Sequence, residues 1–254
     1  MPEISVIISQ RNSGGALVEQ MPVLIAQLDA LDQSFEIIVV DDASRASTVE
    51  TIENLCRQIP PLRAIRLDRR VGLSGSVVAG IRVSTGDKLV FTSAGLEYPP
   101  HQIKDLLDAQ SRGDLVIGRR ATPSSARWLN RIVRTPRRML LNMDIHDPGC
   151  QFWSARREAL VNTPLPRGSY QYLAAFVAMR GYRVTESPIQ YDALAAPDES
   201  LDDGWPSPLN LACAWWLCRR WQEPSYAELR RTENLLPELR VAFFDDMRDS
   251  KRAG

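Results

Sequence analysis

The first half of the chain alternates between short apolar runs and longer segments whose apolar residues recur at helical spacing. Five apolar runs predict buried strands, at 4–9, 36–40, 63–67, 88–92 and 114–118. The segments between them predict helices, at 15–31, 47–59, 73–84 and 100–111. Strands that are apolar along their whole length and alternate with helices indicate a mostly parallel sheet with helices on both faces. The pattern therefore predicts an α/β fold.

The pattern changes after Asp147. A helix is predicted within 170–183 and a strand at 183–191. The acidic, proline-rich stretch 192–208 predicts a long loop, and a tryptophan-rich helix follows it. The second half is thus expected to be less regular than the first.

Length, charge and cysteine spacing narrow the classes of protein. We expect one large domain at 1–222 and a charged helical tail at 223–254. Lys and Arg together number 31, as do Asp and Glu, so the net charge predicts no nucleic-acid partner. The four cysteines lack the spacing of a zinc site. The N-terminus lacks a basic signal-peptide region, and the apolar run 209–218 is about half of a membrane span, so we expect a cytoplasmic protein.

Three loops follow predicted strands and carry polar or small residues. They are 9–15 ("SQRNSGG"), 41–45 ("DDASR") and 92–97 ("TSAGLE"). Ligands of open parallel sheets bind outside the carboxyl ends of the strands. We therefore expect these loops to line one crevice.

Several motifs, taken in order along the chain, point to one family. They are "SVIIS", "FEIIVVDDAS", "RRVGLSGSVVAGIRVSTGDKLVF", "LEYPPHQI", "DLVIGRR", "DPGCQFWSARRE" and "RGYRVTESPI". In this order they resemble the family 2 glycosyltransferases, nearest to the dolichyl- or polyprenyl-phosphate sugar transferases, over roughly 4–220. The resemblance implies the glycosyltransferase A fold, with a nucleotide half at about 1–120 and an acceptor half at about 121–222. It also implies a UDP- or GDP-linked sugar as donor and a polyprenyl phosphate as one class of acceptor.

The resemblance assigns roles to individual positions. Asn12 matches an asparagine beside the nucleotide, and Asp42 matches an aspartate that accepts a hydrogen bond from the base. Gly72 matches a small residue beside the nucleotide, as do Gly75 and Gly80. Asp147 matches a candidate general base on the acceptor side.

Both aspartate assignments have plainer alternatives. Asp41 and Asp42 could cap the helix that follows them, because Asp is favoured at N-caps. Asp147 lies in Asp-Pro-Gly, which is strong turn chemistry.

The chain departs from the family where a metal is normally bound. Relatives have an Asp-x-Asp triplet that holds a divalent cation at the donor diphosphate, but Ser93 and Gly95 stand at the two acidic, nucleotide-binding positions here. Mg²⁺ and Mn²⁺ prefer carboxylate ligands, so the usual site is absent and no cofactor is expected. Glu97 is the only carboxylate left in this loop, and we expect it to be an exposed turn residue. The first loop also has Ser13 in place of an acid, and the acceptor loop is acidic rather than basic.

Arginines are the remaining candidates for phosphate contact. Arg119 and Arg120 follow a predicted strand, and guanidinium groups bind phosphate bidentately. A further series lies on one face of a predicted helix: Arg127, Arg131, Arg134 and Arg138. Three interpretations of this series stay open: a solvated face, a phosphate site, or a surface that meets anionic lipid. The last would place the protein peripherally at the inner membrane face, aided by Trp205, Trp215, Trp216 and Trp221.

Two functions follow from this sequence, and a third is weaker. The first is a sugar transferase that works without the usual metal. The second is an inactive relative that binds nucleotide-sugars or acts as a scaffold, as a homo-oligomer or with an active transferase. A nucleotidyltransferase-like enzyme is disfavoured, because no G-x-G-x-x-R/K phosphate loop follows the first strand.

Overall fold

The computed structural model describes residues 1–95, 97–121, 137–193 and 208–220. All of them belong to one compact unit, Met1–Trp221. Several predicted features lie outside the described residues: Arg127, Arg131, Arg134, Trp205, Trp221 and the tail 223–254.

A single sheet of seven strands organises the chain, in the order β3-β2-β1-β4-β6-β5-β7. Its strands are β1 (Ile4–Gln10), β2 (Phe35–Asp41), β3 (Leu62–Arg66), β4 (Lys88–Ser93), β5 (Leu115–Arg119), β6 (Trp153–Arg156) and β7 (Val184–Pro188). Every strand pair is parallel except the two that involve β6. The predicted α/β fold with a mostly parallel sheet is confirmed.

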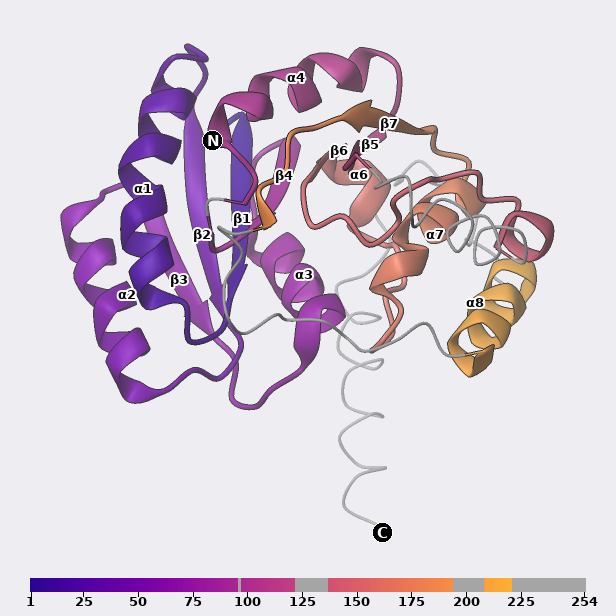
Figure 1. Ribbon diagram of the computed structural model, residues 1–254, viewed down its shortest axis with the longest axis horizontal. Coiled ribbons are helices and arrows are strands. Elements are labelled where there is room, and N and C mark those ends of the chain that lie inside the picture. The colour runs from indigo at the N-terminus through magenta and orange to yellow at the C-terminus, as the bar shows by residue number, and fades with distance from the viewer. Residues whose placement is uncertain (96, 122–136, 194–207, 221–254) are drawn as a thin grey trace, which may run out of the picture. The chain divides into compact units, whose positions relative to one another are not determined.

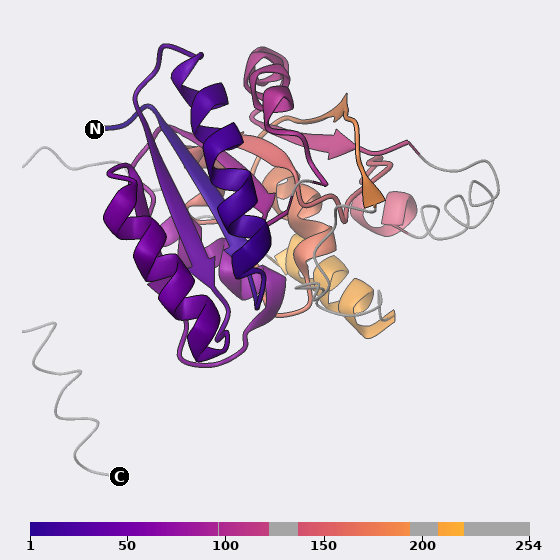
Figure 2. The same cartoon turned by 60° about the vertical axis from the view of Figure 1, so that its left-hand side comes forward.

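Helices cover both faces of the first four strands. The helices of this half are α1 (Gly14–Asp29), α2 (Ala46–Gln58), α3 (Gly72–Val83) and α4 (Ile103–Asp108). Helices α1 and α2 lie on one side of β1 and β2, and α3 lies on the opposite side (Figure 1). Figure 2 shows the same division after rotation, with α1 and α2 side by side. Right-handed crossovers place α3 on the opposite face from α1 and α2, because the chain moves outward from β1 to β3 and then crosses back to β4.

Strand β1 is buried along its whole length, and close packing on its α3 side depends on a glycine. A Cβ atom added at Gly80 would lie 2.4 Å from Cγ2 of Ile7 and 3.3 Å from Cγ2 of Val40. The bare backbone of Gly80 therefore lets α3 approach β1 and β2 more closely than any side chain would allow.

The second half of the chain contains one strand that the sequence pattern did not predict. β6 runs antiparallel between β4 and β5, and Trp153 and Ala155 in it are buried. Trp153 stacks on Phe91 with ring centroids 5.2 Å apart, and its Nε1 donates a hydrogen bond to Tyr170 Oη at 3.0 Å. This cluster forms the core of the second half.

Shorter helices complete the second half. They are α6 (Arg157–Leu160), α7 (Leu173–Met179) and α8 (Pro208–Arg220). Short 3-10 segments flank α4 at Pro100–Gln102 and Ala109–Ser111 and precede α7 at Tyr170–Tyr172. Among the described residues, no helix is both long and apolar enough to cross a bilayer.

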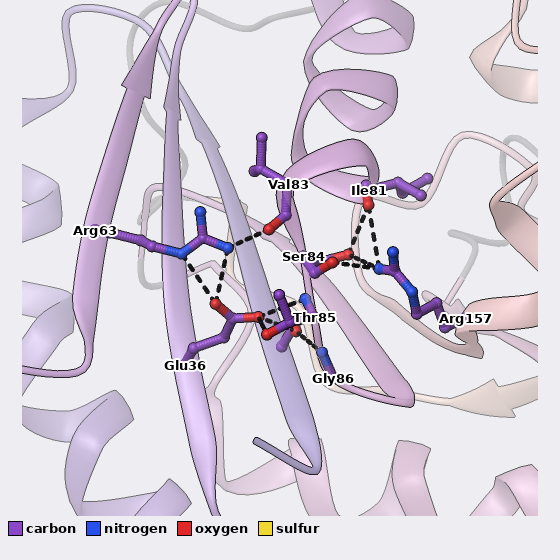
Figure 3. A network of polar contacts seen from close by, with 9 residues as sticks. Glu36, Arg63, Ile81, Val83, Ser84, Thr85, Gly86 and Arg157 are labelled. Atoms are coloured by element: carbon purple, nitrogen blue, oxygen red, sulfur yellow. Dashed lines mark hydrogen bonds and ion pairs between the residues drawn. The ribbon is translucent and has the colours of Figure 1, made fainter. Parts of the chain in front are cut away.

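A polar network ties the end of α3 to the amino ends of the strands (Figure 3). Its centre is Glu36 of β2, whose Oε1 accepts hydrogen bonds from Ser5 Oγ at 2.6 Å and Thr85 N at 2.7 Å. Arg63 of β3 forms an ion pair with Glu36 at 2.8 Å and also donates to the carbonyl of Val83. Partial burial acts to raise the pKa of Glu36, but these hydrogen bonds outweigh it and hold the pKa below its ordinary value of 4.5.

We expect Glu36→Gln to lower the free energy of unfolding by about 1 to 3 kcal/mol at neutral pH, because charge-assisted hydrogen bonds are lost. The lowered pKa means that the contribution of Glu36 is present above pH 4.5 and disappears as the pH falls through the folded-state value. Urea unfolding of both proteins from neutral to acid pH should therefore show a shrinking difference. Glu53→Gln, which removes an exposed partner of Arg57, is the control and should change little. A difference between Glu36→Gln and wild type that stays constant with pH would contradict the assignment.

Candidate functional site

The three loops expected to lie together do so at the carboxyl ends of β1, β2 and β4. Register places Gln10 beside Asp41 and Ser9 beside Ser93. Backbone bonds continue the pairing beyond the strands, from Asp42 N to Gln10 O at 3.0 Å and from Ala94 N to Ser9 O at 3.1 Å. The loops therefore form one polar surface at the edge of the sheet.

Asn12 joins the first loop to the second. Its backbone N donates to Ser44 Oγ at 2.9 Å, and its Oδ1 accepts from Arg45 N at 2.9 Å. Asn12 and Ala43 both adopt left-handed backbone angles, with φ of 55° and 56°. Such conformations cost about 1 to 3 kcal/mol each and occur preferentially at functional sites.

Asp42 is completely buried beneath this surface and binds the backbone of a third segment. Its Oδ1 accepts from Val71 N at 2.7 Å and its Oδ2 accepts from Gly72 N at 3.0 Å. The carboxylate thus lies at the positive end of the α3 dipole. Gly72 has φ of 78°, a value that favours glycine.

The alternative in which Asp41 or Asp42 caps the next helix is wrong, because the N-cap residue of α2 is Arg45. Asp41 instead accepts a hydrogen bond from the Gln10 side chain and lies 3.6 Å from Arg66 Nε. Both aspartates are therefore held by residues that the helix-capping pattern does not include.

The turn at Ser93 and Gly95 is fixed by a glutamine from α1. The side chain of Gln20 is buried, and its Nε2 donates to the carbonyl oxygens of Ser93 at 3.2 Å and Gly95 at 2.7 Å. Gln20 therefore holds the turn through backbone carbonyl groups, and these hydrogen bonds do not depend on the side chains at Ser93 and Gly95.

Glu97 is buried, so the expectation of an exposed turn residue is wrong. Its side chain is 3% exposed, and its Oε1 accepts a hydrogen bond from Ser93 Oγ. Its Oε2 has no hydrogen-bond partner among the described residues. Burial raises the pKa of Glu97 above its ordinary value of 4.5, against the effect of the Ser93 hydroxyl. The burial arises because the chain at Asp192 crosses the loop and donates its backbone N–H to the Glu97 carbonyl at 3.0 Å.

Arg120 and Asp147, predicted separately as site residues, form one ion pair. Arg120 Nε donates to Oδ2 at 2.6 Å and Nη2 donates to Oδ1 at 2.8 Å, so the contact is bidentate. The backbone N of Arg120 adds a third bond to Oδ2 at 3.2 Å. Hydrogen bonding to Asp147 raises the pKa of Arg120 above its ordinary value, against the effect of burial. Arg119 is exposed at the end of β5 and is not part of this pair.

Aromatic side chains connect this ion pair to the loop at Glu97. Cζ of Arg120 lies 5.0 Å from the ring centroid of Tyr191. Tyr191 contacts Tyr98 with centroids 5.2 Å apart, and Tyr98 stacks on Phe152 at 5.4 Å. Tyr98 follows Glu97 directly, so the loop at Glu97 and the Arg120–Asp147 pair share one aromatic cluster.

Glu186 and His146 are site residues that the sequence did not reveal. Oε1 of Glu186 accepts from the backbone N of His146 at 2.8 Å and of Asp147 at 3.1 Å. Its Oε2 contacts His146 Nδ1 at 2.7 Å. Glu186 therefore positions the backbone that carries Asp147. The 39-residue separation between Glu186 and Asp147 gives no local sequence signal.

Residues 5–163 match the family model described as Glycosyl transferase family 2. The chain belongs to this family. A dolichol-phosphate mannosyltransferase of Pyrococcus furiosus is 28% identical over 211 residues, which cover 78% of this chain and 59% of the relative. An undecaprenyl-phosphate 4-deoxy-4-formamido-L-arabinose transferase of Pseudomonas paraeruginosa is 30% identical over 159 residues, covering 61% of this chain and 47% of the relative. This family member thus aligns with about half of the length of these curated relatives.

Solved structures of other sugar-transferring enzymes share the fold. A mannosyltransferase of Pyrobaculum calidifontis, solved with GDP-Man and Mn²⁺, matches with a TM-score of 0.57 at 20% identity, covering 78% of this chain and 58% of that one. Glucosyl-3-phosphoglycerate synthase of Mycobacterium tuberculosis, solved with phosphoglyceric acid, matches with a TM-score of 0.59 at 17% identity, covering 78% and 73%. The glycosyltransferase A fold expected from the sequence is confirmed.

We expect Glu97→Gln to become more stable relative to wild type as the pH rises. The folded protein holds the Glu97 proton more tightly than the unfolded chain, so wild type loses stability from about pH 4.5 upward through the folded-state pKa. Glutamine keeps an acceptor for the Ser93 hydroxyl and has no proton to lose. Urea unfolding of both proteins at several pH values measures the difference. A wild-type advantage that grows with pH would contradict a buried, proton-retaining Glu97.

Proposed function

We propose that this family member transfers a hexose from a UDP- or GDP-linked donor to a lipid phosphate. An oxygen of the acceptor phosphate attacks the anomeric carbon and forms a new C–O bond. The C–O bond to the donor diphosphate breaks, and its electron pair leaves with the nucleoside diphosphate. The observation that carries this proposal is the bidentate Arg120–Asp147 pair, 31% and 16% exposed, linked through aromatic rings to the loop at Ser93 and Gly95.

Three roles within the site follow from this proposal. The loops around Asn12 and the backbone held by Asp42 at Gly72 receive the nucleotide. The loop at Ser93 and Gly95 faces the diphosphate, as in the resemblance. Arg120 offers a planar donor fork that suits phosphate oxygens, and Arg119 adds an exposed cation beside it. The names of the Pyrococcus and Pseudomonas relatives, both lipid-phosphate sugar transferases, support this choice of acceptor.

We further propose that the reaction does not depend on the divalent cation that such donors usually require. The donor set at the loop does not fit one, because Ser93 Oγ is bonded to Glu97, Gly95 has no side chain, and Glu97 is buried with a raised pKa. Among the described residues, no group of three or more His, Cys, Asp or Glu side chains could hold a metal ion. Charge on the departing diphosphate is then neutralised by arginines, of which Arg119 and Arg120 are the described candidates.

A peripheral position at the cytoplasmic face of the membrane suits a lipid-phosphate acceptor. Supporting features are on α8, where Trp216 is 56% exposed and Arg219 and Arg220 end the helix. Exposed tryptophan beside arginine is typical of segments that meet anionic lipid.

The decisive experiment measures sugar transfer from UDP- and GDP-hexoses to a short-chain polyprenyl phosphate, with Mn²⁺ and with EDTA. We expect turnover that EDTA leaves within about twofold, and a loss of at least about 100-fold in Asp147→Asn if this residue is the general base. Loss of activity in EDTA would overturn the metal-independent chemistry. No turnover with any donor would overturn the transferase proposal itself.

The second candidate function is a nucleotide-sugar-binding or scaffolding module without turnover, alone as an oligomer or with an active transferase. The observation that favours it is that Ser93 and Gly95 carry no carboxylate and that the one carboxylate of this loop, Glu97, is buried. Stabilisation by UDP or GDP in thermal denaturation without any transfer would support this function over the first.

A further inference from the structure

The Arg120–Asp147 pair contains a conflict between the two roles assigned to it. Asp147 can act as a base only if a carboxylate oxygen is accessible to a proton donor, yet both oxygens accept hydrogen bonds from Arg120. Arg120 uses its Nε and Nη2 donors for Asp147, so a phosphate can bind bidentately at this edge of the guanidinium only by displacing the carboxylate. Each residue therefore blocks the role proposed for the other.

We propose that Asp147 is an internal competitor for the anion site of Arg120, and that a phosphate group of the substrate displaces it. The proposal rests on the proposed function and deepens it. Carboxylate and phosphate both present paired oxygens that match the guanidinium fork, so one can replace the other without moving the arginine. Displacement frees the carboxylate of Asp147 when an acceptor phosphate arrives, and the freed carboxylate can take the proton of the monoanionic phosphate as its oxygen attacks the anomeric carbon.

The surroundings favour exchange of the side chain without movement of the backbone. Asp147 is held through its backbone N by Glu186 at 3.1 Å, so its carboxylate can rotate away while the loop stays in place. Arg120 is held from the other side by the Tyr191 ring, which keeps the fork oriented when the carboxylate leaves.

Partial exposure to solvent lowers the free-energy cost of separating Asp147 from Arg120. The side chains of Arg120 and Asp147 are 31% and 16% exposed, so water can replace part of the hydrogen bonding that each side chain loses when the pair separates. Separating an ion pair that has this access to solvent costs less than separating a fully buried one, because water can solvate both charges. A phosphate monoester carries about 1.5 to 2 negative charges at neutral pH, so a part of it is monoanionic and keeps one proton. Its charge still exceeds that of the carboxylate, and this difference favours the incoming ligand.

The test is equilibrium binding of inorganic phosphate, farnesyl phosphate and UDP by calorimetry, without turnover. Asp147→Asn should bind phosphate ligands about three- to tenfold more tightly than wild type, because the competitor is weakened. Arg120→Gln should lose at least about tenfold in affinity, and the gain from Asp147→Asn should vanish in the double variant. A purely structural Asp147 would give unchanged or weaker binding.

Asp114→Asn is the matched control. Asp114 has the same 16% exposure and also pairs with an arginine, Arg156, but it lies at the opposite end of β5. Asp114→Asn should leave the affinity for phosphate unchanged. If its affinity rose as much as that of Asp147→Asn, the effect would come from the change in net charge, and the proposal would be overturned. Glu186→Gln tests a nearby charge that does not contact Arg120 and should give a smaller gain than Asp147→Asn.

The ligands separate the two sources of phosphate. If Asp147→Asn binds farnesyl phosphate more tightly than wild type does, the displacing phosphate is that of the acceptor. If only UDP is bound more tightly, the displacing group is the donor diphosphate. No gain with any ligand overturns the exchange. A second measurement uses wild-type protein, so misfolding of a variant cannot explain its result. The ¹⁵N NMR resonance of Arg120 Nε should shift when phosphate is added. If the variants bind phosphate as expected but no sugar transfer is detected, the exchange is supported and the transferase function is overturned. If sugar is transferred but the variants do not show the expected affinities, the transferase function is supported and the exchange is overturned.

Discussion

The parallel pairing of β1 with both β2 and β4 is the constraint on which the rest of the structure depends. β1 is buried along its whole length, so its register cannot slip without exposing apolar residues or burying a mismatch. That register fixes Gln10 beside Asp41 and Ser9 beside Ser93, although these residues are distant in sequence. Packing of a few central residues, such as Ile7 against Gly80, therefore determines where the polar loops meet.

Carboxylates near this edge are held in three different ways, and the difference decides which of them can respond to a ligand. Asp42 has both oxygens bonded to backbone N–H groups and no exposed surface. Glu97 is enclosed with one hydroxyl as its partner and tends to keep its proton. Asp147 is paired with a cation that water can reach. The first two shape the loops, and the third is the one whose partner can be exchanged.

Much of the fold could be predicted from the sequence, because buried parallel strands and amphipathic helices leave strong periodic signals. The spans of β1 and α3 were predicted within one residue at each end. β6 was missed, since four buried residues within "QFWSARRE" show neither alternation nor helical spacing. The burial of Glu97 was also missed, because it depends on a chain crossing at Asp192, nearly a hundred positions away.

The reversed direction of β6 has a consequence for how such a chain can vary. β5 ends at Arg119 and β6 begins at Trp153, and both points lie at the same edge of the sheet because the two strands are antiparallel. The two ends of the connection between these strands therefore lie close together. The length of this connection can change without altering the register of either strand, so sequence changes there leave the sheet intact.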